Sequence, residues 1–174
     1  QAVPALSMRS CESKESGRVR EPTSEKMLSQ PARSKTLPIL IALVEDDVVF
    51  QRTLVASITS TADMAMCGTA TTRAQGLRML EQTQADVLLV DLGLPDGSGI
   101  DVIRVAQQKW PACNAMVCTT FGDETHVFQS LEAGACGYLL KDCSPEQLVT
   151  EIRHLHAGGS PISPLIARQV LRRF

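Results

Sequence analysis

Short apolar runs alternate with segments of helical periodicity along the chain from residue 37 onward. Between the runs, apolar residues recur at spacings of three and four, which places them on one face of a helix. Short and nearly continuous apolar runs between such segments are typical of buried parallel strands. The predicted strands are Ile39–Val44, Met64–Gly68, Val87–Val90, Ala115–Cys118 and Gly137–Leu140.

Five helices are predicted, one after each strand. Their apolar faces consist of Phe50, Leu54, Val55 and Ile58; Ala74, Leu77 and Leu80; Ile100 and Ile103; Val127, Phe128 and Leu131; and Leu148, Val149, Ile152 and Leu155. Capping residues agree with this placement, because their side chains accept hydrogen bonds from the first free amides of a helix. The predicted caps are Asp47 for the first helix, Thr72 with Gln75 as a capping box for the second, and Ser144, Pro145 and Gln147 for the fifth, which Gly158–Gly159 ends.

This alternation predicts the fold class. Five β-α repeats of roughly 25 residues, with apolar strands, indicate a parallel sheet covered on both faces. Right-handed crossovers then give a doubly wound α/β fold with a five-stranded parallel sheet and five helices. Ligands of such folds sit at the carboxyl ends of the strands, so functional side chains are expected at that edge.

Reactive side chains follow four of the five predicted strands. The carboxyl ends of parallel strands meet at one edge of the sheet, so we expect these side chains to converge although they are far apart in sequence. The second strand contributes no reactive group. The converging residues are Glu45, Asp46 and Asp47 after the first strand, Asp91 after the third, Thr119 and Thr120 after the fourth, and Lys141 after the fifth.

The charge of this group indicates its chemistry. Clustered carboxylates repel one another, and a hard divalent cation relieves the repulsion. Mg²⁺ prefers oxygen ligands and binds through one or two carboxylates together with phosphoryl oxygens. Asp91 would then be a nucleophile that accepts a phosphoryl group as an acyl phosphate. Lys141 and the Thr119 hydroxyl would receive the remaining phosphoryl oxygens.

Each of these residues also has a simpler interpretation. Asp47 is expected to be a helix cap. Asp91 alone fits a loop acid that precedes a turn at residues 95–97. Lys141 alone fits a solvated charge, and Thr119 alone fits the β-propensity of a strand end. Their joint placement at the ends of four strands favours the functional interpretation.

At these residues the sequence resembles a response-regulator receiver domain of bacterial two-component signalling. The resemblance covers about residues 38–158, with four motifs in the order of the family. It implies a flavodoxin-like sheet with strand order 2-1-3-4-5. The motifs are LVEDD at residues 43–47, VLLVDLGLPDGSG at 87–99, VCTT at 117–120 and LEAGACGYLLKD at 131–142.

The resemblance assigns the metal and phosphoryl sites. It implies that Glu45 (through water) and Asp46 help to bind Mg²⁺ and that Asp91 is the phosphoacceptor and a further metal ligand. The carbonyl oxygen of Gly93 would complete the metal shell. Lys141 would be the phosphate partner.

The resemblance also assigns the switch residues. Thr119 would be the switch hydroxyl, Tyr138 the switch aromatic residue, and Thr120 a secondary position. In this family, the residues two past the phosphoacceptor and two past the switch hydroxyl flank the path of the hydrolytic water. Here they are Gly93 and Phe121.

Two residues depart from the usual family pattern. The first acid is Glu45 rather than the commoner aspartate, which affects metal geometry. Lys141 is followed by Asp142 instead of the frequent proline, so no cis peptide bond is expected there. Neither change removes a reactive group, and we therefore expect a competent receiver.

The motif around Lys141 and the Ser-Pro-Glu-Gln-Leu sequence after it resemble the NarL/FixJ subfamily, whose members have a C-terminal helix-turn-helix domain. Here we expect a receiver over residues 37–158 and a linker helix, cut short, over residues 159–174, with DNA bound only through an output domain absent from this chain. The Arg168, Arg172 and Arg173 cluster is interpreted as a face of that linker.

Charge and composition add limits to this picture. The chain has 174 residues, 44% of them apolar and 21% charged, as in an ordinary globular protein. Residues 1–36 have seven basic and four acidic residues and no periodicity, so we expect a disordered leader. Residues 37–174 have ten basic and fifteen acidic residues, which makes the body a poor nucleic-acid binder. No apolar run exceeds eight residues and no signal-peptide pattern is present, so a cytoplasmic protein without a membrane span is expected.

The resulting functional hypothesis is a phosphorelay switch that is not a metabolic enzyme. A sensor histidine kinase would phosphorylate Asp91, and the surface of the fourth helix, fifth strand and fifth helix would change. This change would control an output, expected to be transcription through a C-terminal DNA-binding domain absent from this chain, and it could form a homodimer surface. One alternative is a pseudo-receiver that binds partners without phosphorylation. Another is a Mg²⁺-dependent aspartyl phosphohydrolase. Such enzymes have a second aspartate two residues after the nucleophile, and this chain has Gly93 at the corresponding position after Asp91.

Overall fold

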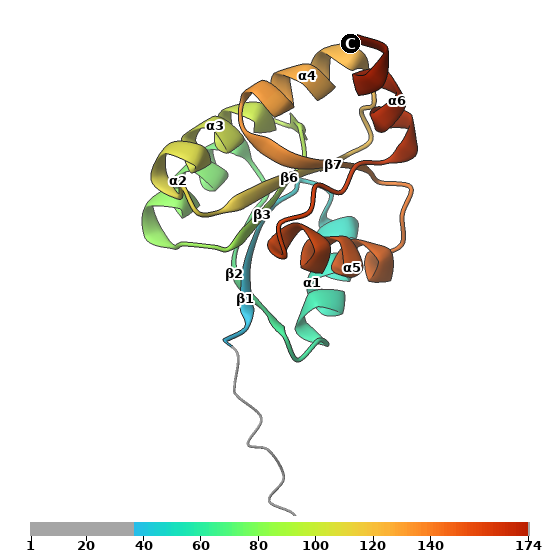
Figure 1. The fold of residues 1–174 in the computed structure, drawn as a ribbon. Helices are drawn as coiled ribbons and strands as arrows, with labels where there is room; N and C mark the ends of the chain where they lie inside the picture. The colour runs from blue at the N-terminus through green and yellow to red at the C-terminus, as the bar shows by residue number, and fades with distance from the viewer. Residues whose placement is uncertain (1–36, 174) are drawn as a thin grey trace, which may run out of the picture. The chain divides into compact units, whose positions relative to one another are not determined.

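A computed structural model describes residues 37–173 of the chain (Figure 1). The predicted leader at residues 1–36 and Phe174 lie outside the described residues. Five parallel strands form one sheet in the order β2-β1-β3-β6-β7, which corresponds to the expected order 2-1-3-4-5. They are β1 (Ile39–Val44), β2 (Met64–Ala70), β3 (Val87–Val90), β6 (Asn114–Thr119) and β7 (Ala135–Leu140).

Six helices occur in the described part of the chain, five of them after successive strands of the sheet and one near its C-terminal end. They are α1 (Val48–Thr59), α2 (Arg73–Gln82), α3 (Gly99–Lys109), α4 (Glu124–Glu132), α5 (Pro145–His156) and α6 (Pro164–Arg173). The doubly wound α/β fold predicted from the sequence is therefore confirmed, with α6 inside the segment predicted as a linker helix.

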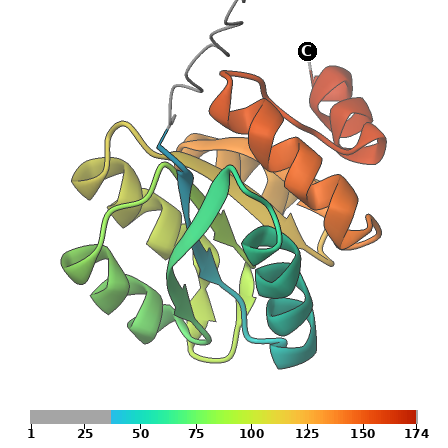
Figure 2. The same cartoon turned by 90° about the horizontal axis from the view of Figure 1, so that it is seen from below.

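The helices cover the sheet from both faces (Figures 1 and 2). Alternate residues of β1 enter two separate cores, because successive side chains of a strand point to opposite faces. Ile41 and Leu43 pack with residues of α1 and α5, whereas Ala42 and Val44 pack with residues of α2, α3 and α4. All four side chains are at most 1% exposed, which explains why the strand reads as a continuous apolar run.

Three strands are longer than the apolar runs that predicted them. β2 continues to Ala70, β6 includes Asn114 and Thr119, and β7 begins at Ala135. Ala135 pairs with Ala115 of β6. Backbone pairing continues through small and polar residues that interrupt an apolar pattern, so the sequence understated these strands.

A two-residue hairpin lies just beyond β3. Its strands, β4 (Gly93–Leu94) and β5 (Gly97–Ser98), pair antiparallel around the turn that the sequence predicted at residues 95–97. Strands this short have no periodic signal, so only the turn was foreseen. The Asp96 side chain in this turn accepts hydrogen bonds from the amides of Arg73 and Ala74, at 2.6 and 2.8 Å, and so holds the start of α2 against the hairpin.

The predicted caps are confirmed in two helices and half confirmed in a third. Asp47 accepts from the amides of Val49 and Phe50 at the start of α1, and Ser144 and Gln147 form a complete capping box on α5. At α2, Thr72 accepts from the amide of Gln75. The Gln75 side chain, however, accepts from Thr71 instead of Thr72, so the predicted box is wrong in this half. Gly158, with φ of 94°, follows α5 as expected.

Two further findings concern residues 37–173. No helix in this range is both long and apolar enough to cross a bilayer. No peptide bond in it is cis, including the one between Lys141 and Asp142.

Candidate functional site

Three side chains from different strands meet at the carboxyl edge of the sheet. Glu45 follows β1, Asp91 follows β3 and Lys141 follows β7. The Lys141 Nζ lies 2.6 Å from Asp91 Oδ2 and 2.8 and 2.7 Å from the two carboxylate oxygens of Glu45. The side chains of Lys141, Glu45 and Asp91 are 10%, 1% and 9% exposed. Lys141 is thus not the solvated charge of the simpler interpretation, and Asp91, although it lies in the loop after β3, is buried.

Parallel pairing positions these residues. The Glu45 amide donates to the Ala70 carbonyl and the Asp91 amide donates to the Val44 carbonyl, both at 2.9 Å, so each acid leaves the sheet in register with its neighbour. The Lys141 amide donates to the Thr119 carbonyl at 2.9 Å. The Lys141 ammonium also lies 4.9 Å from the centre of the Phe50 ring on α1, a cation–π contact.

Gln51 supports Glu45 and was not found from the sequence. Its side-chain amide donates to the carbonyls of Glu45 and Ala70, at 3.1 and 3.2 Å, and so binds the ends of β1 and β2. The Asp47 amide donates to Glu45 Oε1 at 2.9 Å. Gln51 lies within the predicted first helix next to its apolar residues, and an amide there has no motif that would have revealed this role.

Burial and hydrogen bonding determine the pKa shifts of Glu45 and Lys141. Burial raises the pKa of Glu45 above its usual value, and the hydrogen bonds from Lys141 and Asp47 only partly offset this. Burial lowers the pKa of Lys141, but its bonds to Asp91 and Glu45 outweigh that effect, and the net pKa lies above the usual value. Lys141 therefore stays a cation in contact with two carboxylates.

The acids form a group able to hold a metal ion. Ligand oxygens of Glu45, Asp46 and Asp91 all lie within 4.8 Å of one another, and Asp46 is the exposed member. A set of carboxylate oxygens alone suits a hard cation such as Mg²⁺ better than a soft metal, so the residues present fit the predicted cofactor. The Gly93 amide donates to Asp91 Oδ1 at 3.3 Å, and its carbonyl as a metal ligand stays a prediction.

The predicted switch residues lie beside this group. Thr119 ends β6, is fully buried, and its hydroxyl oxygen accepts from the Phe121 amide at 3.3 Å. Tyr138 on the neighbouring strand β7 is also fully buried, and its hydroxyl donates to the Phe121 carbonyl at 2.7 Å. Burial raises the pKa of Tyr138. Thr120, by contrast, is exposed.

Phe121 covers the backbone next to Asp91. A Cβ atom added at Gly93 would lie 2.6 Å from the Phe121 ring, so the absence of a side chain at Gly93 is what allows the ring to sit there. Phe121 is 43% exposed, and its ring stacks on the His126 imidazole, with 5.3 Å between ring centres. The two positions that the family resemblance places along the water path are therefore in contact.

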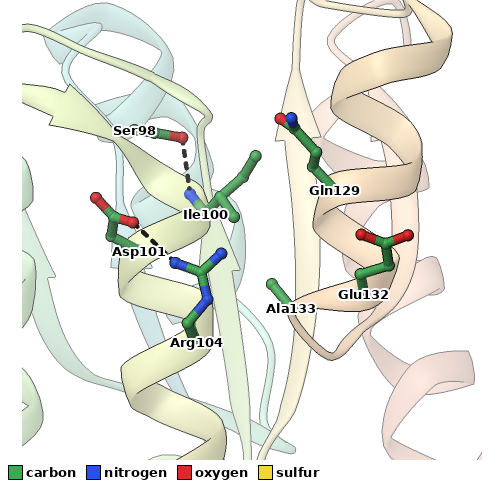
Figure 3. A pocket seen from close by; sticks show the side chains of 7 residues that line it. All are labelled: Ser98, Ile100, Asp101, Arg104, Gln129, Glu132 and Ala133. Carbon is green, nitrogen blue, oxygen red and sulfur yellow. Dashed lines mark hydrogen bonds and ion pairs between the residues drawn. The ribbon is translucent and has the colours of Figure 1, made fainter.

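A separate cavity of about 420 Å³ lies between α3 and α4 (Figure 3). Asp101 and Arg104 line it from α3, where they form an ion pair of 3.1 Å, and Gln129 and Glu132 line it from α4. None of the residues that line it belongs to the acidic group. The cavity and the acidic group are thus formed by different residues.

Comparison of the sequence with known proteins identifies a matching family. The response regulator receiver domain family matches residues 41–153. The uncharacterized transcriptional regulatory protein YhcZ of Bacillus subtilis is 37% identical over 131 residues, which are 75% of this chain and 61% of YhcZ. The nitrate/nitrite response regulator NarL of Escherichia coli K12 is 29% identical over 126 residues, or 72% of this chain and 58% of NarL. The chain therefore spans about three fifths of the length of these curated relatives.

Solved structures agree with the sequence relatives. A LuxR-family two-component response regulator from Aurantimonas sp. SI85-9A1 superposes with a TM-score of 0.71 at 27% identity, over 78% of this chain and 97% of that one. The likeness extends over nearly the whole of that protein, so the sheet and its covering helices are shared.

Proposed function

The chain belongs to the response regulator receiver domain family, and on that basis we propose that it is a phosphorelay response regulator that accepts a phosphoryl group on Asp91 from a sensor histidine kinase. The contact between Asp91 and Lys141, with two further carboxylates within 4.8 Å, is the observation that supports this most. A buried nucleophilic carboxylate beside a fixed cation and a metal-binding group is what phosphoryl transfer requires.

In the proposed reaction, a carboxylate oxygen of Asp91 attacks the phosphorus of a phosphohistidine. The P–N bond breaks, the imidazole leaves with the bonding electron pair, and an acyl phosphate forms on Asp91. Mg²⁺ held by Glu45, Asp46, Asp91 and the Gly93 carbonyl would neutralise charge on the transferred group. Lys141, now 2.6 Å from Asp91, lies where it can pair with a phosphoryl oxygen.

Thr119 and Tyr138 would pass the change on. The Thr119 hydroxyl would donate to another phosphoryl oxygen, and Phe121, bonded to both Thr119 and Tyr138, would move with it. The altered surface of α4, β7 and α5 would then control the output. Regulation of transcription through residues beyond this chain is consistent with relatives named as transcriptional regulatory proteins. Formation of a homodimer on phosphorylation is the other proposed output.

We further propose the division of the chain and its location. Residues 37–158 would form the receiver and residues 159–174 the linker to an output domain, in a cytoplasmic protein. Gly93 opposes the phosphohydrolase alternative, because that position lacks the second aspartate that protonates a leaving group.

Labelling by a small phosphodonor tests the proposal. Acetyl phosphate with Mg²⁺ should add one phosphoryl group to the 174-residue chain, detected by intact mass, and Asp91→Asn should abolish the addition. Asp47→Asn is the matched control, because Asp47 is an adjacent acid whose capping role asparagine retains. Equal labelling of Asp91→Asn and the unmodified chain would overturn the assignment.

A further inference from the structure

Helix α6 is docked on the face that the proposed switch would change. Ile166 of α6 is fully buried in the same core as Val127 of α4 and Tyr138 of β7. The Arg173 guanidinium lies 4.1 Å from the centre of the Phe128 ring on α4. Figure 1 shows α6 beside α4, next to the edge of β7. The segment expected to be a linker therefore packs against the receiver.

The residues that lead into α6 extend the sheet. The Tyr138 amide donates to the Pro161 carbonyl at 2.9 Å, and the Ser163 amide donates to the Tyr138 carbonyl at 3.0 Å. Ile162 forms a parallel bridge with Tyr138, and the Leu140 amide donates to the Ser163 hydroxyl at 3.0 Å. These bonds fix the start of α6 at Tyr138, the predicted switch residue.

The loop after Thr119 joins the phosphoacceptor edge to α6. On one side, Phe121 bonds to Thr119 and its ring covers Gly93. On the other side, the Gln169 side-chain amide of α6 donates to the Gly122 carbonyl. The Gln169 Oε1 atom is buried and has no hydrogen-bond partner among the described residues. Among the described residues, the Gly122 carbonyl is thus the one hydrogen-bond partner of the Gln169 side chain, and it accepts from the side-chain nitrogen.

We propose that Gln169 is a latch that holds α6 on the receiver while the loop at residues 120–122 keeps its present position, and that phosphorylation of Asp91 releases the helix. This inference rests on the proposed function. When Thr119 turns toward a phosphoryl group, the loop moves and Gln169 loses its acceptor. The buried side-chain amide of Gln169 would then have no hydrogen bond at either its nitrogen or its oxygen, which disfavours the docked state of α6. Release uncovers apolar surface on α4 and β7 together with the Ile166 and Val170 face of α6.

Hydrogen exchange of the complete 174-residue chain tests the latch. Amides of residues 165–173 should exchange about tenfold faster after acetyl phosphate and Mg²⁺ are added, which corresponds to the loss of one buried hydrogen bond. Without phosphodonor, Gln169→Glu should give a similar increase, because a carboxylate cannot donate to the Gly122 carbonyl. Arg168→Ala, at the adjacent exposed position, should leave exchange unchanged and is the matched control.

The outcomes separate the latch from the proposed function. Intact mass is measured on the same samples, and unchanged exchange in β1 and β3 shows that each variant is folded. A phosphorylated chain whose α6 exchanges at the resting rate would overturn the release while the proposed function stands. Resting exchange in Gln169→Glu would overturn the role of Gln169. Absence of phosphorylation would overturn the proposed function and, with it, the release.

Discussion

Glu45 shows how one side chain sets the arrangement of the acidic group. It is one methylene longer than the aspartate common in the family, and both of its carboxylate oxygens lie within 2.8 Å of the Lys141 Nζ. Lys141 in turn binds Asp91 at 2.6 Å. The Lys141 ammonium therefore offsets the repulsion between the two buried carboxylates. Asp46 is the exposed carboxylate of the group.

Asp46 provides a test of the metal site at the scale of one residue. Mg²⁺ at ten times its dissociation constant should raise the free energy of unfolding by about 1.4 kcal/mol, because it binds only the folded chain. Asp46→Asn should remove most of this increase, since it deletes one of three carboxylates. Urea denaturation with Mg²⁺ or with EDTA measures the difference. Asp47→Asn should keep the full increase, and an equal response of both variants would rule out Asp46 as a ligand.

Phe121 provides a second test. Its ring occupies the space beside Gly93, and we expect it there to obstruct water that approaches an acyl phosphate on Asp91. Phe121→Ala should speed loss of the phosphoryl group severalfold. This increase is smaller than tenfold, which would correspond to lowering the activation free energy of hydrolysis by about 1.4 kcal/mol. The phosphoprotein half-life, followed by intact mass, measures this. Val49→Ala removes another exposed apolar side chain and should leave the half-life unchanged; a slower loss in Phe121→Ala would contradict the obstruction.

The residues that follow strands could be predicted, and those that support them from helices could not. Asp91 and Lys141 each come directly after an apolar run, so topology alone brings them to one edge. Gln51 and Gln169 act through side-chain amides on helices. An amide within an amphipathic helix reads as an ordinary polar residue, and its partner is defined only once the chain has folded.

At the scale of the elements, the sequence predicted which helix forms but not the surface on which it packs. The pattern predicted a helix within residues 159–174, and α6 occupies Pro164–Arg173. It did not predict that α6 packs on α4 or that residues 161–163 bond to β7. Periodicity identifies an apolar face, but it does not identify the surface that covers it.

An ion pair ties α5 to the loop between α1 and β2 and gives a pH-dependent prediction. Arg153 binds both carboxylate oxygens of Asp63, at 2.7 and 2.9 Å, and this holds the pKa of Asp63 below its usual 3.8. A carboxylate with a lowered folded pKa stabilises the protein above its unfolded pKa, and the contribution is lost as pH falls through the folded value. Both side chains are more than two fifths exposed, so the effect is small.

Asp63→Asn should lower the free energy of unfolding by about 0.5 kcal/mol near pH 7, in the range of solvent-screened ion pairs. The difference from the unmodified chain should shrink as pH falls below 3.8 and should be lost once pH has passed through the lowered folded pKa of Asp63. It should also shrink in high salt. Urea denaturation across pH measures both effects. A difference that stayed constant through this fall in pH would show that the charge of Asp63 is not its cause.

For the whole molecule, charge and length define the proposed role. Residues 37–174 have five more acidic than basic residues, which disfavours direct contact with DNA phosphates. The chain spans 61% of YhcZ and 58% of NarL. Within the described residues, the loop at 120–122 connects the Asp91 edge to α6, which lies in the proposed linker.

The central claim is that Asp91 accepts the phosphoryl group, and locating that group on the chain tests it most directly. Borohydride reduces an acyl phosphate of aspartate to homoserine, which marks the modified residue in a peptide map. After treatment with acetyl phosphate and Mg²⁺, we predict homoserine at position 91 and unmodified aspartate at positions 46 and 47. Homoserine at position 46 or 47, or phosphorylation that leaves Asp91 intact, would contradict the account.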